Sequence, residues 1–509
     1  LYYSDNNTIS GNTANDNFYY GIIIYNSDYN RITGNTVNNN WSINQRTGIF
    51  IYISSDNNIV SGNTANNNTY YGIYLNNNCY NNTISGNTAT HNTLYGIYLN
   101  DNSYNNTLTG NTANLNSEYG IYLNDYSDNN TLSGNIVNDN GIYGIHLIDS
   151  NDNIILGNTA LNNVTSNQQR GISLSYGINN KISGNTANNN TFYGIWLKGS
   201  NNNTVMGNIA NDNYWGIYLE NSDNNMVSGN NVNNDAIGVY LSYSDNNTIS
   251  GNNATNNYLL GFYLVYSGNC TITGNIVNFN SDGMFLFHGD DNMISRNTAS
   301  NNTNKGIIIH QSDRNNISGN LINDNIQHGL EIDEWSDENN ITENHFYFNL
   351  NYTIYLTDTC WRTIISKNIF VSETENFIIG AGRDTIKESN YYGVIPPSFV
   401  VEIIDLSFSP TEFVLTINVS SQVTFLQVSN FSTQMWWNGN LIFSNDIKYI
   451  GNNLYNVSLT PIFVEPNDDP ILLNMTVKAA YHNSKYYETY IAVEQVSSPN
   501  FLFIEIKDQ

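Results

Sequence analysis

Side chains that could carry out acid–base chemistry gather in one late segment of the chain. General acid–base catalysis needs a base placed for proton abstraction, with carboxylates or basic groups nearby to hold substrate charge or calcium. The candidates are His288, Asp290, Asp291, Arg296, His310, Arg314, His328, Glu331, Asp333 and Glu334. Their positions drift in phase relative to the repeat of the chain, so we expect a solvated polar face or a cap before the next domain. We therefore assign no catalytic residue.

Metal-ligating side chains are scarce. The 509 residues contain seven histidines, six methionines and three cysteines. The histidines and methionines show no close ligand spacing, and Cys79, Cys270 and Cys360 fall in repeats that are far apart. We predict no metal site, no cofactor and no intramolecular disulfide.

Aromatic side chains recur once per repeat, at the fourth residue of the motif Tyr-Gly-Ile-Tyr-Leu. Alternation with the apolar residues on either side places them on the outer face of a strand. Rings stacked one repeat apart would stabilise a sheet. The same strip could equally bind sugar rings or a neighbouring protein. Its members are Phe50, Tyr74, Tyr98, Tyr122, Trp196, Tyr218, Tyr240, Tyr263 and Phe285.

Sequons for N-glycosylation, Asn-X-Ser/Thr, occur along the whole chain and are typical of a secreted surface. Many share one phase of the repeat, where turn chemistry generates them and where glycans about 4.8 Å apart would collide. The better candidates lie outside that row, and those beyond residue 395 do not depend on the repeat. We predict glycosylation at Asn40, Asn163, Asn253, Asn351, Asn418, Asn430, Asn456 and Asn474.

The charge balance narrows the class of partner. There are 16 Lys and Arg against 43 Asp and Glu, a net charge of −27, which excludes a nucleic-acid partner. Only 12% of residues are charged while asparagine is abundant, a composition that suits an outer surface. No apolar run approaches the roughly 20 residues that span a bilayer. Leu1 opens in the middle of a repeat, so we expect a secreted protein whose signal peptide is not represented.

One repeated motif must position all these side chains. Copies recur about every 22 to 24 residues and read Asn-Asn-Thr-Ile-Ser-Gly-Asn-Thr-Ala, an Asn-rich turn, then Tyr-Gly-Ile-Tyr-Leu. We call the glycine of Gly-Asn the anchor. Arg296, Glu343 and Lys367 replace it in three late copies, which makes about sixteen coils, each coil being one copy of the repeat. The other anchors are Gly11, Gly34, Gly62, Gly86, Gly110, Gly134, Gly157, Gly184, Gly207, Gly229, Gly251, Gly274 and Gly319.

Apolar residues within each copy alternate with polar ones, which is the two-residue period of a strand. The residue two before the anchor is always aliphatic, and the one three after it is small at first, as in Ala89 and Ala113, and larger later, as in Phe346. One coil buries about four side chains at roughly 1.5–3 kcal/mol each, so only stacking of coils can stabilise the fold. The asparagine after each anchor should then form an amide ladder along the axis.

These features predict an all-β protein, a right-handed parallel β-helix of about sixteen coils over residues 1–395, with its handedness set by the strand-crossover rule. A leucine-rich repeat has a similar period but needs denser leucine and a helical segment. The repeat stops near Tyr391 and Pro396-Pro397 marks a boundary. About seven alternating runs follow, two of them around Val423–Val428 and Phe501–Ile506, and predict an immunoglobulin-like or fibronectin-like β-sandwich over residues 396–509.

The segment Asn81–Leu99, which holds one full copy of the motif, resembles the NosD-type repeat of the pectin-lyase-like β-helix superfamily. It is similar above all to long Asn-rich versions in archaeal surface and secreted proteins. The resemblance covers residues 1–395 and implies the fold. It leaves function open, because that superfamily includes polysaccharide lyases, epimerases, a periplasmic protein linked to copper-site maturation, tailspikes and adhesins.

We expect a non-enzymatic extracellular surface glycoprotein that acts as a scaffold or adhesin. Its expected partners are further copies of itself or other surface proteins, since an uncapped β-helix end exposes strand edges. Two alternatives stay open, a polysaccharide lyase or epimerase and a carbohydrate-binding protein that uses the aromatic strip.

Overall fold

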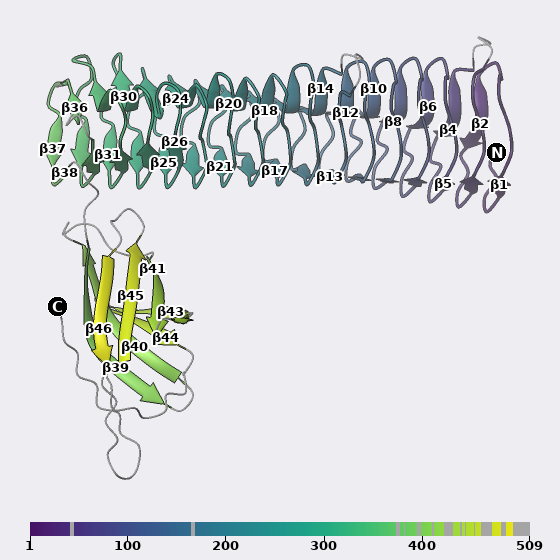
Figure 1. Cartoon of the computed structure of the whole chain (residues 1–509). Coiled ribbons are helices and arrows are strands. Elements are labelled where there is room, and N and C mark those ends of the chain that lie inside the picture. Colours follow the sequence, from purple (N-terminus) through teal and green to yellow (C-terminus); the bar gives the residue numbers. More distant parts are fainter. Residues whose placement is uncertain are drawn as a thin grey trace. The chain divides into compact units, whose positions relative to one another are not determined.

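The chain folds into two compact units in a computed structural model (Figure 1). The structure describes residues 1–40, 45–163, 168–372, 377–380 and 382–393, together with the strands beyond them. The first unit comprises Leu1–Ile369 and Asn376–Asn390, and the second comprises Phe370–Glu375 and Tyr391–Gln509. Every regular element of the described residues is a β-strand, so the predicted all-β class is confirmed.

The first unit is a parallel β-helix in which each coil contributes one strand to each of two long sheets. The long-strand sheet holds sixteen strands, which confirms the expected number of coils. Its strands are β2 (Tyr20–Tyr25), β4 (Thr47–Tyr52), β6 (Tyr71–Asn76), β8 (Tyr95–Asn100), β10 (Tyr119–Leu123), β12 (Tyr143–Ile148), β14 (Arg170–Ser175), β16 (Tyr193–Lys198), β18 (Trp215–Glu220), β20 (Ile237–Ser242), β22 (Leu260–Val265), β24 (Asp282–Phe287), β27 (Ile307–His310), β30 (His328–Asp333), β33 (Tyr352–Leu356) and β36 (Ile378–Ile379).

A second, short-strand sheet of seventeen strands contains the residues just before the anchors. Its strands are β1 (Thr8–Ser10), β3 (Arg31–Thr33), β5 (Ile59–Ser61), β7 (Thr83–Ser85), β9 (Thr107–Thr109), β11 (Thr131–Ser133), β13 (Ile154–Leu156), β15 (Lys181–Ser183), β17 (Thr204–Met206), β19 (Met226–Ser228), β21 (Thr248–Ser250), β23 (Thr271–Thr273), β25 (Met293–Ser295), β28 (Asn316–Ser318), β31 (Asn340–Thr342), β34 (Ile364–Ser366) and β37 (Ile386–Glu388).

A third face follows the anchors. Single parallel bridges link it from Thr13 to Thr298, and in the late coils they lengthen into a five-stranded sheet. The strands of that sheet are β26 (Thr298–Ser300), β29 (Leu321–Asn323), β32 (His345–Tyr347), β35 (Ile369–Val371) and β38 (Tyr391–Gly393).

Successive coils lie in register, so equivalent residues meet along the axis. Tyr74 pairs with Tyr98 and Ile73 with Ile97 between β6 and β8, and Ile84 pairs with Leu108 between β7 and β9. Strands about 4.8 Å apart give the sixteen coils a length on the order of 75 Å. The two-residue period read from the sequence is thereby confirmed as strand alternation.

The core is the stack of inward apolar rows. Ile84, Leu108, Ile97 and Leu99 are completely buried, and so is the small row that includes Ala113. In the late coils this small row widens to Ile322, Phe346 and Phe370, which are also fully buried. The predicted pattern of inward positions is confirmed, and each coil relies on its neighbours to cover both faces of these side chains.

Amide side chains form three ladders inside the solenoid. In the row after the anchors, the Asn111 Oδ1 accepts hydrogen bonds from both the backbone N–H and the Nδ2 of Asn87, each at 3.0 Å. The Asn111 Nδ2 donates to the Ile84 carbonyl at 2.8 Å and to the Asn135 Oδ1 at 3.0 Å. Both donors and both acceptor sites are therefore used, as predicted for this row.

The other two ladders were not predicted. One runs through the asparagine that precedes the short strands, as in Asn106, whose backbone N–H donates to the Asn130 Oδ1 at 2.7 Å. The other runs through the Asn-rich turn, as in Asn92, whose Nδ2 donates to the Asn116 Oδ1 at 3.0 Å. The sequence does show asparagine at two further positions of the repeat. Because asparagine is frequent in turns, these positions were indistinguishable from ordinary turn residues.

Two insertions keep the third ladder intact by using a longer amide. The spacing of anchors stretches after Gly34 and after Gly157, and each stretch ends at a buried glutamine. Gln45 Nε2 donates to the Asn68 Oδ1 at 2.8 Å, and Gln168 Nε2 donates to the Asn190 Oδ1 at 2.8 Å. In both coils the longer glutamine side chain supplies the rung that asparagine supplies elsewhere.

The two glycines of each coil serve different purposes. The anchors adopt φ near +60°, and a Cβ at Gly110 would meet nothing within 4 Å, so the left-handed backbone alone favours glycine there. The residues that replace anchors, among them Arg296 and Glu343, keep this conformation. At Gly96, by contrast, a Cβ would lie 2.7 Å from the Ala113 Cβ and from the Gly120 carbonyl oxygen. Only glycine fits that corner.

The second unit contains two four-stranded antiparallel sheets. Its strands are β39 (Phe399–Ser409), β40 (Glu412–Ser421), β41 (Phe431–Trp437), β42 (Asn440–Ile442), β43 (Ser444–Gly451), β44 (Leu454–Leu459), β45 (Ile471–Ala479) and β46 (Lys485–Ile491). The strand runs expected near residues 423–428 and 501–506 lie outside the described residues.

Candidate functional site

The outer face of the long-strand sheet carries two adjacent rows of side chains. The central row is the predicted aromatic strip, and the flanking row lies three residues earlier in each coil. Rings in the central row stack face to face, with Tyr74–Tyr98 centroids 4.8 Å apart and planes 4° from parallel. In the flanking row Tyr95–Tyr119 centroids are 4.7 Å apart at 3°. Rings of the two rows meet edge to face, as Tyr95 and Tyr98 do at 75°.

Stacking takes up the ring faces of the strip. Tyr98 and Tyr122 are each only 8% exposed, whereas Tyr74, Tyr240 and Tyr263 are half-buried. Burial raises the pKa of the Tyr98 phenol above its ordinary value and that of Tyr119 to about 12. The hydroxyls are neutral at physiological pH, and Tyr74, Tyr98 and Tyr122 each have a ring stacked on both faces. Binding by the strip stays a prediction that would use ring edges and hydroxyls.

The same two rows change character in the late coils. Between β24 and β33 the flanking row reads Asp282, Lys305, His328 and Tyr352, and the central row passes from Ile308 to Glu331 and Tyr355. Lys305 Nζ lies 2.8 Å from the Glu331 Oε1, and His328 Nε2 lies 3.6 Å from the Glu331 Oε2. The His328 ring stacks on Tyr355 at 5.0 Å.

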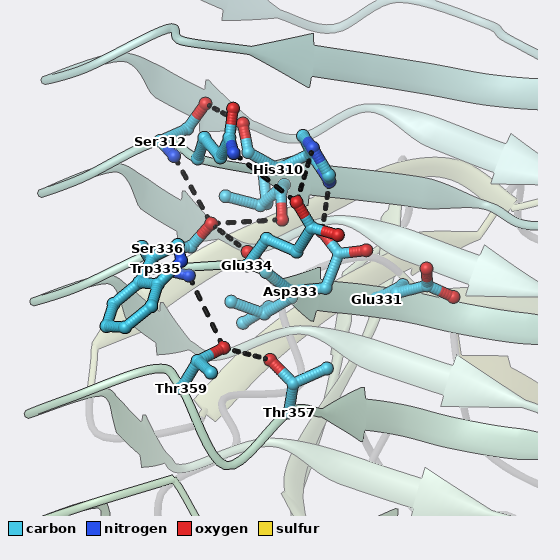
Figure 2. A network of polar contacts seen from close by, with 12 residues as sticks. His310, Ser312, Glu331, Asp333, Glu334, Trp335, Ser336, Thr357 and Thr359 are labelled. Carbon is cyan, nitrogen blue, oxygen red and sulfur yellow. Dashed lines mark hydrogen bonds and ion pairs between the residues drawn. The ribbon is translucent and has the colours of Figure 1, made fainter.

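A second cluster of polar side chains lies beside the Lys305–Glu331 pair, at the ends of the same strands. His310 Nδ1 is 2.7 Å from the Asp333 Oδ1, and His310 Nε2 is 3.4 Å from the Glu334 Oε2. Figure 2 shows both carboxylates reaching this imidazole, while hydroxyls tie the adjoining turns together below it. Ser336 Oγ, for example, accepts from the Ser312 backbone N–H at 3.2 Å.

The expectation that the late polar residues form no constellation needs correction. His310, His328, Glu331 and Asp333 do share one face, because strand pairing places His310 opposite Asp333. The other candidates lie elsewhere. Arg314 forms a separate turn cluster, 2.7 Å from Asp291 and 3.5 Å from Asp290, His288 stacks on Tyr266 at 4.7 Å, and Arg296 occupies an anchor turn.

Sequence reasoning also missed two members of this face, Asp282 and Lys305. Their register with His328 was the available signal, because all three fall in the phase that holds tyrosine in earlier coils. The Asp282 carboxylate accepts a hydrogen bond from the Lys305 backbone N–H at 3.0 Å. Both are outward residues of the flanking row.

Burial sets the protonation of these groups. It raises the pKa of the Asp282 carboxyl, against the opposing effect of the Lys305 backbone N–H. It also raises the pKa of Asp333, against the neighbouring His310, and lowers that of His328, against Glu331. Lys305 is paired with Glu331, and the His310 ring lies against Asp333 and Glu334, so the polar groups of this face contact one another.

The sequons within the described residues are accessible to different degrees. Asn40, Asn163 and Asn351 are exposed, and Asn253 is half-buried with its Oδ1 accepting from the Thr255 hydroxyl at 2.5 Å. Asn418, Asn456 and Asn474 lie on strands β40, β44 and β45. Asn430 lies outside the described residues. Glycosylation of all eight stays a prediction.

Comparisons with known families agree with this architecture. The family model described as "Right handed beta helix region" matches residues 1–160. The model described as "Periplasmic copper-binding protein (NosD)" matches residues 123–259 and 253–394. No curated protein sequence matches the chain significantly.

Solved structures are similar at low identity. The Dettilon tailspike protein is 14% identical, with a TM-score of 0.39 over 76% of this chain and 83% of that one. The A-module of the mannuronan C-5 epimerase AlgE6 from Azotobacter vinelandii is 9% identical, with a TM-score of 0.30 over 72% and 91%. The periplasmic alginate epimerase AlgG is 14% identical, with a TM-score of 0.30 over 68% and 76%. Likenesses at these values carry no information on activity.

The described residues do not fit a copper site. They contain no group of three or more His, Cys, Asp or Glu that could hold a metal ion. Cys79, Cys270 and Cys360 are buried in different coils, and burial raises the pKa of the Cys79 and Cys270 thiols to about 12. A thiol must lose its proton to bind a metal well, so we assign no chemistry through copper.

None of the described residues forms a helix of the length and apolar character needed to cross a bilayer.

Proposed function

The chain belongs to the NosD family of right-handed parallel β-helix proteins, and we propose that it is a non-enzymatic extracellular scaffold or adhesin. The observation that carries this proposal is the set of three amide ladders, in which side chains bond coil to coil along the solenoid. A satisfied buried polar network makes a fold rigid and specific. Within the described residues, unpartnered rungs occur only in the other two ladders, at Asn30, Asn153, Asn315 and Asp235, and none lies in the ladder after the anchors. A stiff rod is what a surface spacer needs.

The chemistry of the outer face supports the same proposal. A catalytic base must be free to reach a substrate proton, yet His310 has a carboxylate at each ring nitrogen and Lys305 is paired with Glu331. The tyrosines of the strip are held neutral by burial. Groups that could act as acid or base are thus already engaged with one another.

We propose that its partners are further copies of the chain or other surface proteins. Exposed apolar side chains occur immediately before several strands of the long-strand sheet. Among them are Tyr70, Phe192, Tyr214 and Leu259, which are 39–45% exposed. Apolar residues gathered on one surface are typical of interaction sites. The second unit, for which we propose an immunoglobulin-like sandwich over residues 396–509, would connect the rod to its neighbours.

Activity and assembly measurements test the scaffold proposal together. The full chain is incubated with alginate and with pectate, and unsaturated sugar ends are followed by ultraviolet absorbance while polymer composition is followed by NMR. We expect no change in either polymer, and rods or ordered assemblies in electron micrographs. Conversion of either polymer above a heat-denatured control would overturn the non-enzymatic assignment.

Glycosylation is tested on protein purified from its natural source. We expect hexose-bearing peptides at the exposed Asn40, Asn163 and Asn351 and at the four sequons beyond residue 395. Asn253 should be modified least, because its amide is half-buried and hydrogen-bonded. Peptide mass spectrometry that found all of these asparagines unmodified would remove the glycoprotein part of the proposal.

The late charged face favours one second candidate, a lyase or epimerase that acts on an acidic polysaccharide. Lys305 could hold a substrate carboxylate and His310 could transfer a proton, if substrate displaced their present partners. His310→Ala and Lys305→Met would then each abolish any conversion detected in the assay above. Conversion that persisted in both variants would exclude this face as its source.

A further inference from the structure

Both aromatic rows are interrupted together on strands β12, β14 and β16. The central row there reads His146, Ser173 and Trp196 in consecutive coils. In the flanking row Arg170 stands between the rings of Tyr143 and Tyr193. Ser173 thus places a short side chain between two rings, and the Arg170 guanidinium lies over the neighbouring Trp196 ring.

Arg170 is surrounded by rings and has no counter-charge. Its guanidinium carbon lies 4.9 Å from the Tyr143 ring centroid, 5.3 Å from that of Tyr193 and 4.7 Å from that of Trp196. Among the described residues no carboxylate lies within 4.0 Å of it, although the chain carries a net charge of −27. Ring faces stabilise a cation. One guanidinium nitrogen donates to the Gln169 Oε1 at 3.4 Å and the Tyr193 hydroxyl is a second acceptor, but the Nε–H has no partner.

Polar atoms without partners gather at this interruption. Thirteen buried side-chain nitrogen or oxygen atoms of the described residues lack a hydrogen bond, and four of them belong to this one spot. They are His146 Nδ1, Arg170 Nε, Ser173 Oγ and Trp196 Nε1. His146, Ser173 and Trp196 are more than nine-tenths buried. Leaving each such atom unpaired costs about 1–3 kcal/mol, so the arrangement is explained best by something that binds there.

The chemistry of the four atoms defines the occupant. Arg170 Nε–H and Trp196 Nε1–H can only donate, and the Ser173 hydroxyl can donate as well. Donors that converge around an uncompensated guanidinium match an oxyanion, and planar guanidinium matches a carboxylate in particular. Burial, with Arg170 contributing, lowers the pKa of His146 to about 3, so the neighbouring imidazole is neutral and adds no second cation.

We propose that Arg170, Ser173 and Trp196 form a binding site for a ligand carboxylate on the outer face of the β-helix. Arg170 is half-buried and is a single long side chain on a rigid strand. Rotation of this side chain opens the path to Ser173 and Trp196 beneath it. The carboxylate then receives hydrogen bonds from the guanidinium, the hydroxyl and the indole, while Tyr143 and Tyr193 line the site.

The chain contains a matched control for this site. Arg46 also follows an insertion, one position earlier in its coil than Arg170. Its guanidinium lies 4.9 Å from the Tyr19 ring and 5.8 Å from the Tyr70 ring. Arg46, Tyr19 and Tyr70 are all exposed, so this arginine lies on the surface and not over buried polar groups. A general attraction of anions to arginine would therefore affect both sites, and a built site only Arg170.

Binding is measured by isothermal titration of the full chain with two pairs of probes. Benzoate is compared with benzamide, and D-glucuronate with glucose, so that each anion has a neutral counterpart on the same body. We expect at least one anion to bind at least tenfold more tightly than its counterpart, and the better anion shows whether the carboxylate belongs to a flat or a sugar-like ligand. Equal affinity within both pairs, or no binding of any probe, would overturn the proposal.

Variants assign the binding to these residues. Arg170→Gln should weaken the anion at least tenfold, whereas Arg46→Gln should leave it unchanged. Ser173→Ala removes one donor with little change in packing and should weaken binding severalfold, which keeps the test valid if Arg170→Gln does not fold. Equal effects of the Arg46 and Arg170 variants, or full affinity in both Ser173→Ala and Arg170→Gln, would contradict the site. A crystal structure with benzoate that showed only ordered water on Ser173 and Trp196 would do so too.

Discussion

The early coils around β6 to β10 and the late coils around β27 to β33 share one backbone and differ in what they display. Outside, the early coils present stacked tyrosines and the late coils present paired charges. Inside, both keep the same amide ladder, with Asn111 and Asn320 making the same four kinds of hydrogen bond. The strict register of the coils therefore limits which residues the inward rows can carry. The outward rows can change type, provided that residues in adjacent coils stack on or pair with each other.

The largest effect should come from breaking what the two regions share. Replacing Asn111 or Asn320 with leucine leaves two donors of the preceding rung and one carbonyl unpaired. The following amide oxygen loses one of its two hydrogen bonds and keeps the one from the backbone N–H of the replaced residue. At about 1–3 kcal/mol for each of the three unpaired buried groups, we expect each variant to lower the free energy of unfolding by at least about 3 kcal/mol. Urea denaturation followed by circular dichroism measures it. The exposed Thr93→Ala is the control, and a loss in only one region would show that the ladders are not equivalent.

The next largest effect should belong to the early coils alone. Tyr98→Ala removes a ring that stacks on Tyr74 and Tyr122 at 4.8 and 4.9 Å and is only 8% exposed. We expect a loss of about 3 kcal/mol, measured by the same denaturation. The 58% exposed Tyr258 is the matched site, and Tyr258→Ala should change stability by less than about 0.5 kcal/mol. Similar losses in both variants would mean that stacking contributes little.

In the middle coils, one rung of the third ladder is a side chain that can ionise. Asp235 takes an amide position in the third ladder, where its Oδ1 accepts from the Asn213 backbone N–H at 2.7 Å and its Oδ2 has no partner. Burial raises the pKa of this carboxyl well above 3.8. Its neutral form is favoured in the fold, so this contribution to stability is full below pH 3.8 and declines as pH rises through the higher folded pKa.

Asp235→Asn restores the uncharged amide and should remove that decline. We expect a gain of about 1 kcal/mol or more at neutral pH, and little or no gain at about pH 3, below the ordinary pKa of the carboxyl. Denaturation of both proteins across this range is the measurement. A gain that did not depend on pH, or a loss at neutral pH, would show that Asp235 is accommodated as a charged group.

The smallest effect should be confined to the late coils. High salt screens the Lys305–Glu331 and His310–Asp333 pairs but leaves stacked rings unaffected. We expect the free energy of local opening of β27 and β30 to fall by less than about 1 kcal/mol, and that of β6 and β8 to stay unchanged. Hydrogen exchange of the two regions at low and high salt measures this difference. Equal responses in the two regions would show that the charge pairs do not stabilise the late coils.

The sequence by itself determined the solenoid. A repeat of about 23 residues can only be buried by stacking, so the inward rows and the first amide ladder follow from spacing alone, as Ile84 and Asn111 illustrate. The aromatic strip was also readable, because a two-residue period decides which side of a strand a residue faces.

Only the tertiary structure decided how the outward rows interact. Whether the ring face of Tyr98 is open or stacks on Tyr122 depends on side-chain rotation, which the spacing of residues does not encode. His310 meets Asp333 because the late coils hold strict register despite replaced anchors, and the Arg170 guanidinium lies over the Trp196 ring, next to the short side chain of Ser173. Periodicity fixes the backbone position of a side chain, but the neighbours that surround it in space determine its partners, its protonation and its exposure.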